Sequence, residues 1–139
     1  MYRTIFFGTI IAAAITTTAC TSIANHISGP ASLEDVKQLL DSRFTYISNR
    51  EKWGTDFYWK PGETGDRPFT GNCVNYAEAA VYQLKKHGIP AREWLVKTEA
   101  DEFHMVACAD GWCIDNRRHS PFPQRDFSYH WIVDATPTR

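Results

Sequence analysis

Residues 73–87 carry a complete helix signal and constrain the fold more than any other part of the chain. The apolar residues of this segment recur with helical spacing at Ala77, Ala80, Val81 and Leu84. The spacing predicts an amphipathic helix with one buried face, and Gly88 followed by Ile89-Pro90 predicts where it ends. Cys73 lies four residues before Ala77, so we expect it in the first turn of the helix and on the same face.

A cysteine in the first turn of a helix meets the positive end of the helix dipole and unpaired backbone N–H groups. Both favour the thiolate over the thiol. A buried structural cysteine is the alternative, and it is the usual explanation for a lone Cys. The preceding Gly71-Asn72, the terminal position of Cys73, and a His and an Asp downstream favour a reactive thiol instead.

The composition indicates one domain. The 139 residues are 43% hydrophobic and 14% aromatic, with a net charge of −1, which suits one core and is too short for two. Because no basic run occurs, the charge gives no case for a nucleic-acid partner. Neither GxxxxGK[ST] nor GxGxxG is present, so no nucleotide site is predicted.

The first 19 residues are predicted to be an export signal and are set aside from the fold. Arg3 gives a positive start, and the apolar run from Ile5 to Ile15 is too short to span a bilayer. The Ala19-Cys20 junction resembles a bacterial lipoprotein cleavage site, which predicts lipidation of Cys20. Because Thr17 stands where such sites usually have Leu, ordinary signal-peptide cleavage nearby is the alternative.

This interpretation divides the chain into a signal peptide (1–19), a lipidated N-terminus and tether (20–31), and one domain (32–139). A lipoprotein cysteine carries more than one acyl chain, and stable membrane anchoring requires more than one. We therefore expect the protein in the periplasm or cell envelope, anchored to a membrane through Cys20.

Cys108 and Cys113 flank a short segment that contains Asp110-Gly111. Asp-Gly is a strong two-residue hairpin signal, and such a turn would place the two cysteines directly opposite each other. Opposed positions on paired strands can form a disulfide, and an exported protein meets oxidising conditions. We predict a Cys108–Cys113 disulfide with Cys73 free; two reduced, packed cysteines are the alternative.

The segment before the central helix is predicted as a helix followed by an aromatic loop. Ser32 and Asp35 form a capping pair, and a hydrophobic stripe follows at Val36, Leu39, Leu40 and Phe44. Residues 43–70 are rich in aromatics and broken by proline and glycine, which is typical of a structured loop. This loop is either a hydrophobic lid over the core or a substrate-groove wall in which Trp53 or Trp59 donates an indole N–H.

The segment after the central helix is predicted to form an antiparallel sheet. Strands are expected at 91–98, 103–109, 112–116 and 127–134, with a loop at 117–126. The last strand should be half-buried, with one face formed by Phe127, Tyr129, Trp131 and Val133. Helices followed by strands predict an α+β fold with a small antiparallel sheet.

In the predicted hairpin the numbers of opposed residues sum to 221, so position 106 faces position 115 and position 104 faces position 117. His104 and Asp115 are then diagonal neighbours on one face of the sheet. The helix should pack its small Ala77/Ala80 face on this sheet and bring Cys73 toward His104. A thiolate attacks a carbonyl, an imidazole moves the proton, and a carboxylate orients the imidazole. The Cys73 backbone N–H is an expected oxyanion donor, with Trp59, Trp53 or Asn72 as its partner.

The histidines and cysteines allow other interpretations. His130 is a reserve candidate for the base, whereas His87 is expected to complement the helix dipole. Cys73, His104, Cys108 and Cys113 could ligate zinc, but structural zinc sites usually have two short Cys pairs, so this is the weaker hypothesis and no metal is expected.

Several motifs in order resemble the transglutaminase-like superfamily, and more closely the bacterial transglutaminase-like cysteine proteinases. They are Gly71-Asn72-Cys73-Val74-Asn75-Tyr76-Ala77, Gly88-Ile89-Pro90-Ala91-Arg92, His104-Met105-Val106 and Ile114-Asp115-Asn116-Arg117, with Trp53-Gly54 and 56–59 upstream. The resemblance implies a papain-like α+β fold with Cys73 as nucleophile, His104 as base and Asp115 as orienting carboxylate. It also implies proteolysis of an exported or surface protein, or acyl transfer.

The sequence departs from this family around the cysteine. The family usually has acidic residues there, linked to calcium binding in its adhesin-cleaving members, whereas Asn72, Val74 and Asn75 stand here. Because an oxygen-rich cation site needs carboxylates, calcium dependence is not carried over.

The sequence therefore predicts an exported cysteine peptidase that acts through a thioester on a protein or peptide substrate, without a cofactor. One alternative is a transamidase, in which an amine accepts the acyl group. The other is a catalytically silent module that binds a surface protein through its aromatic loop.

Overall fold

The computed structural model describes residues 30–56, 58, 60–126 and 128–136. The predicted signal peptide, Cys20, most of the tether, Trp59 and Phe127 lie outside the described residues. The helices of the described chain are α1 (Pro30–Asp41), α2 (Asn49–Trp53) and α3 (Cys73–Lys86). Its strands are β1 (Phe44–Tyr46), β2 (Phe69–Gly71), β3 (Arg92–Lys97), β4 (Phe103–Ala109), β5 (Trp112–Ile114), β6 (Phe122–Pro123) and β7 (His130–Asp134).

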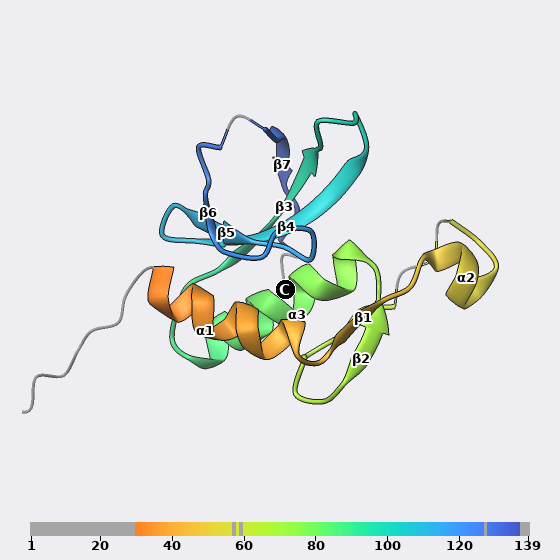
Figure 1. The fold of residues 1–139 in the computed structure, drawn as a ribbon, viewed down its shortest axis with the longest axis horizontal. Coiled ribbons are helices and arrows are strands. Elements are labelled where there is room, and N and C mark those ends of the chain that lie inside the picture. Colours follow the sequence, from red (N-terminus) through yellow and green to blue (C-terminus); the bar gives the residue numbers. More distant parts are fainter. Residues whose placement is uncertain (1–29, 57, 59, 127, 137–139) are drawn as a thin grey trace, which may run out of the picture.

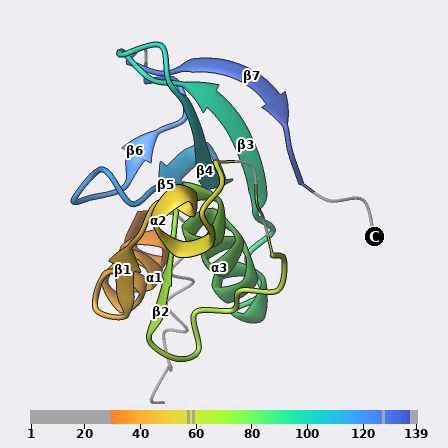
Figure 2. The same cartoon turned by 90° about the vertical axis from the view of Figure 1, so that its right-hand side faces the viewer.

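The main sheet is antiparallel, with the strand order β6-β5-β4-β3-β7, and α1 and α3 pack against one of its faces (Figure 1). The turned view shows the sheet curving away from these helices (Figure 2). The described chain thus has the predicted α+β architecture with a small antiparallel sheet. None of its described helices is long and apolar enough to cross a membrane.

Two clusters of buried side chains lie on opposite faces of the sheet. The helix-side core combines residues of α1 and α3 with the small Ala107 and Ala109 of β4. The second cluster lies on the other face, where the chain from β5 to β7 folds over the sheet. Its buried members are Val96, Val106, Cys108, Cys113, Phe122 and Tyr129. The sheet is therefore covered on both faces, by helices on one and by its own C-terminal segment on the other.

Helix α3 begins at Cys73 as the spacing predicts, and its start is fixed by a capping box. The Asn72 side chain accepts a hydrogen bond from Val74 N–H at 3.0 Å, while Asn72 N–H donates to Asn75 Oδ1 at 3.2 Å. These bonds satisfy two backbone donors that a helix start otherwise leaves open. At the far end Gly88 takes a left-handed conformation (φ 76°), which confirms the predicted stop.

The first helix begins three residues earlier than a cap at Ser32 predicts. Helix α1 begins at Pro30, so Ser32 lies inside the helix and not at its cap. A proline fits the first turn of a helix because its missing N–H would have no partner there. The helix ends at Asp41, and Phe44, expected on the same stripe, belongs to β1, where its ring packs 5.1 Å from those of Phe69 and Tyr76.

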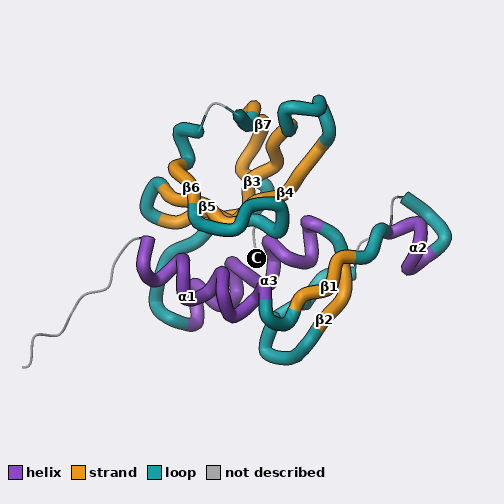
Figure 3. The backbone as a smooth tube through the Cα atoms, viewed as in Figure 1, coloured by secondary structure: helices purple, strands orange, loops and turns teal. Residues whose placement is uncertain are grey.

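Residues 43–70, predicted as one structured loop, contain regular elements at both ends (Figure 3). Strands β1 and β2 pair in parallel, from Phe44 opposite Phe69 to Tyr46 opposite Gly71. Helix α2 lies between them in the chain; Ser48 caps its start by accepting from Glu51 N–H at 3.1 Å, and Gly54 ends it. The S-x-x-E signal was present in the sequence, but a five-residue helix has too little periodicity to be recognised.

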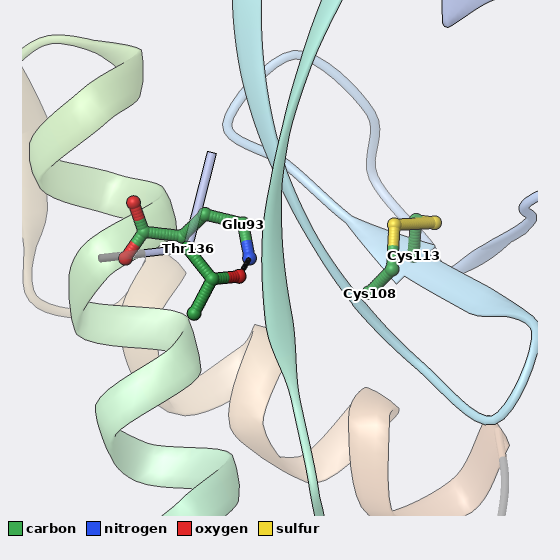
Figure 4. The surroundings of a disulfide bond; sticks show 4 residues. All are labelled: Glu93, Cys108, Cys113 and Thr136. Atoms are coloured by element: carbon green, nitrogen blue, oxygen red, sulfur yellow. Dashed lines mark hydrogen bonds between the residues drawn. A yellow bond between two sulfur atoms is a disulfide. The ribbon is translucent and has the colours of Figure 1, made fainter. Parts of the chain in front are cut away.

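The β4–β5 hairpin has the predicted register, with Cys108 opposite Cys113 and Ala107 opposite Ile114. Both turn residues have positive φ, 51° at Asp110 and 80° at Gly111, as a type I′ turn requires. A disulfide joins Cys108 to Cys113 (Figure 4). In the same view Glu93 N–H of β3 donates to Thr136 Oγ1 at 2.9 Å, which ties the chain after β7 to the sheet.

The alternation predicted for the last strand is wrong after Trp131. Trp131 pairs with Val96, but Leu95 pairs with Val133, so one residue of β7 is bulged out of the ladder. Because side chains alternate faces, this insertion places Val133 on the opposite face from Trp131, where it is half exposed.

Candidate active site

Cys73 is the first residue of α3 and, among the described residues, the cysteine left free by the disulfide. Its own backbone N–H is one of the first four of the helix, which have no partner within it. The side chain is partly buried and lies close enough to the His104 ring for each group to shift the pKa of the other. The helix start and the sheet thus meet at this thiol.

His104 lies near the beginning of β4 and is only 5% exposed. Its Nε2 faces Asp115 Oδ2 at 3.0 Å. Since Asp115 occupies the Nε2 side, Nδ1 is left as the nitrogen that can exchange a proton with the thiol. The structure therefore places the side chains of Cys73, His104 and Asp115 next to one another.

Asp115 follows β5 directly and is fully buried. Its Oδ1 accepts the backbone N–H groups of Arg117 and Arg118 at 3.1 and 2.9 Å. Its Oδ2 accepts the Tyr129 hydroxyl at 2.7 Å as well as facing His104. A buried carboxylate requires such compensation, and here both of its oxygens have partners.

Tyr129 was missed as a site residue by reasoning from the sequence. The predicted alternation of the last strand did place it on the buried face, but nothing in the sequence links it to Asp115, fourteen positions earlier. Only the fold of the 115–129 segment over the sheet brings the hydroxyl to the carboxylate.

The electrostatics shift the pKa values of Cys73 and His104 in the directions that favour their charged forms. Burial raises the pKa of the Cys73 thiol. His104 and the backbone N–H groups of Met105 and Val74 lower this pKa by more than burial raises it, so the net pKa falls below its ordinary value. Burial lowers the pKa of His104, but contacts with Asp115 and Cys73 outweigh this and raise it to about 9. Burial likewise raises the pKa of Asp115, while His104, Tyr129 and Arg118 N–H bring it below its usual range.

The three candidates for the second oxyanion donor lie in different parts of the chain. The side-chain oxygen of Asn72 caps α3 by accepting the Val74 N–H. Trp53 is 44% exposed in α2, packs 4.7 Å from Tyr58, and lines a pocket of about 320 Å³ that reaches Asn75 in the first turn of α3. Trp59 lies outside the described residues.

The other histidines of the described residues are exposed, unlike His104. His130, the reserve base, is an exposed residue of β7, and His87 is the exposed C-cap residue of α3, where a dipole-complementing role was expected. His119 is exposed in the loop after β5.

The disulfide removes two of the four ligands that a zinc site would need. Cys108 and Cys113 are bonded to each other and are not available as thiolates. Within the described ranges no group of three or more His, Cys, Asp or Glu side chains is arranged to hold a metal ion.

Comparison with known proteins gives a match of fold. No protein-family model and no curated protein matches the chain. Among solved structures the chain resembles Legionella pneumophila LapG with a TM-score of 0.59 and 18% identity. The match covers 73% of this chain and 61% of that one, so this chain spans less than two thirds of LapG. At this identity the likeness establishes a shared fold.

Proposed function

We propose that this chain is a transglutaminase-like cysteine peptidase that cleaves an exported or surface protein through Cys73, His104 and Asp115. One observation carries the proposal: His104 contacts both the partly buried Cys73 thiol and the buried Asp115 carboxylate. The fold that the chain shares with Legionella pneumophila LapG supports the superfamily named in this proposal.

In the proposed reaction the Cys73 thiolate attacks the substrate carbonyl carbon and forms the C–S bond. The oxygen becomes an oxyanion, toward which Cys73 N–H at the start of α3 is a suitable donor. His104 then gives its proton to the leaving nitrogen, the C–N bond breaks, and a thioester remains. Water attacks the thioester while His104 takes up its proton, and cleavage of the C–S bond releases the acid and restores the thiolate.

Each group has a defined part in this scheme. Asp115 orients the imidazole and stabilises its charge, so it needs to stay ionised, which agrees with its lowered pKa. His104 needs to carry a proton at neutral pH, which agrees with its pKa of about 9. A thioester can also pass to an amine, so the transamidase remains the alternative outcome of the same machinery.

The test compares the purified chain with its Cys73→Ala variant. We expect iodoacetamide to modify Cys73 near neutral pH, and we expect a thiol-reactive peptide probe to label the same residue on intact cells. Envelope proteins whose fragments appear with the wild type and vanish with Cys73→Ala are the substrates. Added primary amine that becomes attached to those proteins would identify a transamidase.

An inert thiol, or the same fragments from the Cys73→Ala variant, would contradict the proposal. If the unreactive protein still bound an envelope protein, the silent binding module would be the better description.

A further inference from the structure

Tyr129 shares an acceptor with His104, because its hydroxyl donates at 2.7 Å to Asp115 Oδ2, the oxygen that faces His104 Nε2 at 3.0 Å. The tyrosine is 4% exposed and its ring meets the His104 ring edge-on at 5.7 Å. Two donors thus compete for the negative charge of one carboxylate oxygen, inside a site from which water is largely excluded. Interactions of this kind are strong where the surroundings are buried.

The Tyr129 ring is held in place by its own segment of chain. Phe122 packs against it edge-on at 5.6 Å, and the Arg118 guanidinium lies 4.5 Å from its centroid. Arg118 is itself fixed, because it bonds Asp126 at 2.5 Å and also contacts Ser128 Oγ. The segment after β5 therefore forms a loop whose two ends are joined by the hydrogen bond from the Tyr129 hydroxyl to Asp115.

The charged and titratable groups around this point come from several elements. Cys73 of α3 and Asp115 after β5 contact His104, while Arg117 and Arg118 lie over the Tyr129 ring. Burial and Asp115 raise the pKa of Tyr129 to about 12, although both arginines act in the opposite direction. The hydroxyl therefore keeps its proton at neutral pH and acts toward Asp115 as a donor.

We propose that Tyr129 is a positioning residue, which fixes the Asp115 carboxylate and weakens its hold on the protonated His104. The proposal rests on the proposed function, since it deepens the role of the same site. Removing the hydroxyl leaves Asp115 in place through Arg117 and Arg118 N–H, but concentrates the charge of Oδ2 on His104. The imidazolium is then held more tightly and gives up its proton less readily.

The experiment follows the His104 ring by NMR as a function of pH in Tyr129→Phe. We expect the loss of the imidazolium proton to move from about pH 9 to higher pH. Tyr129→3-fluorotyrosine, introduced at this one position, keeps the shape of the side chain and makes the hydroxyl a stronger donor, so we expect the opposite displacement. This second variant differs by one small atom and keeps the test open if Tyr129→Phe does not fold.

Tyr82→Phe is the matched control, because Tyr82 is an exposed residue of α3 and lies outside the site. It should leave the His104 titration unchanged. An unmoved or lowered His104 titration in Tyr129→Phe, or a raised one in the fluorinated variant, would overturn the proposal and leave Tyr129 as a packing residue. The NMR readout needs no substrate, so it can fail or succeed independently of peptidase activity.

Discussion

At the residue scale, the pKa of Cys73 depends on one neighbour more than on the helix that this residue begins. Burial alone would raise the pKa of this thiol, and the helix start contributes only a partial charge. The His104 contact reverses the effect of burial, because a thiolate beside an imidazolium is favoured where water is scarce. His104 in turn keeps its proton because Asp115 lies on its other side.

Replacing His104 should therefore raise the pKa of Cys73. In His104→Asn, burial acts without the imidazolium, so less thiolate is present at any pH below the new pKa. We expect the iodoacetamide labelling rate of Cys73 at pH 6 to fall by about tenfold or more, and the rate to recover as the pH rises. His87→Asn, at the other end of α3, is the matched control and should label like the wild type; equal profiles for both variants would contradict the ion pair.

At the element scale, the start of α3 is fixed by a close approach between Gly71 and Asn75. A Cβ at position 71 would lie 2.6 Å from the Asn75 Cβ and closer still to its Oδ1, the atom that accepts Asn72 N–H. Since Gly71 does not have a positive φ, space and not backbone conformation requires the glycine. The position of the thiol therefore depends on the absence of a side chain two residues earlier.

Gly71→Ala should displace Asn75 and break half of the capping box. We expect the free energy of unfolding to fall by about 1–3 kcal/mol, because a cap is lost and a packed site is overfilled. Labelling of Cys73 in the folded protein should also slow, as the helix start moves. Thr70→Ala, an exposed neighbour in β2, should change neither quantity, and a Gly71→Ala variant as stable as wild type would refute the close-approach argument.

The β4–β5 hairpin is the second element on which the site depends, since His104 lies on β4 and Asp115 directly follows β5. Its disulfide closes a short loop, so in the chain-entropy account reduction should lower the free energy of unfolding by about 2 kcal/mol. Denaturant titrations of Cys73→Ala with and without reductant isolate this effect, because among the described residues only the Cys108–Cys113 bond then differs. Identical curves would mean that the Asp110-Gly111 turn holds the hairpin unaided.

At the scale of the whole molecule, the site lies where a helical layer meets a sheet. Cys73 comes from α3, His104 from β4 and Asp115 from the residue after β5, so the distance between helix and sheet affects the Cys73–His104 contact. Small buried residues lie at this junction, Ala80 on α3 and Ala107 and Ala109 on β4. Small side chains let helix and sheet approach closely, and close-packed interiors transmit any change in volume.

A larger side chain at this junction should separate the layers. In Ala107→Leu we expect a loss of about 1–3 kcal/mol in the free energy of unfolding and slower labelling of Cys73 near neutral pH, because the thiol moves away from His104. Ala100→Leu, in the exposed turn between β3 and β4, adds the same volume without touching the core. A destabilised Ala107→Leu protein with unchanged labelling would show that the contact tolerates separation of the layers.

The sequence alone predicted the parts of this molecule that obey local rules. The apolar spacing and Gly88 set the limits of α3, and Asp110-Gly111 set the register that opposes Cys108 to Cys113 and places His104 near Asp115. These features depend on backbone geometry within a few residues of each other. The same local reasoning placed Cys73 in the first turn of its helix.

The tertiary structure decided what depends on contacts between distant segments. The β1–β2 pairing, the bulge that turns Val133 outward, and the Tyr129 bond to Asp115 all follow from how separate segments pack. No periodicity records them, because a hydrogen bond across fourteen residues depends on the path of the chain between its two ends. Local chemistry thus identified the candidate groups, and packing decided which side chains surround them.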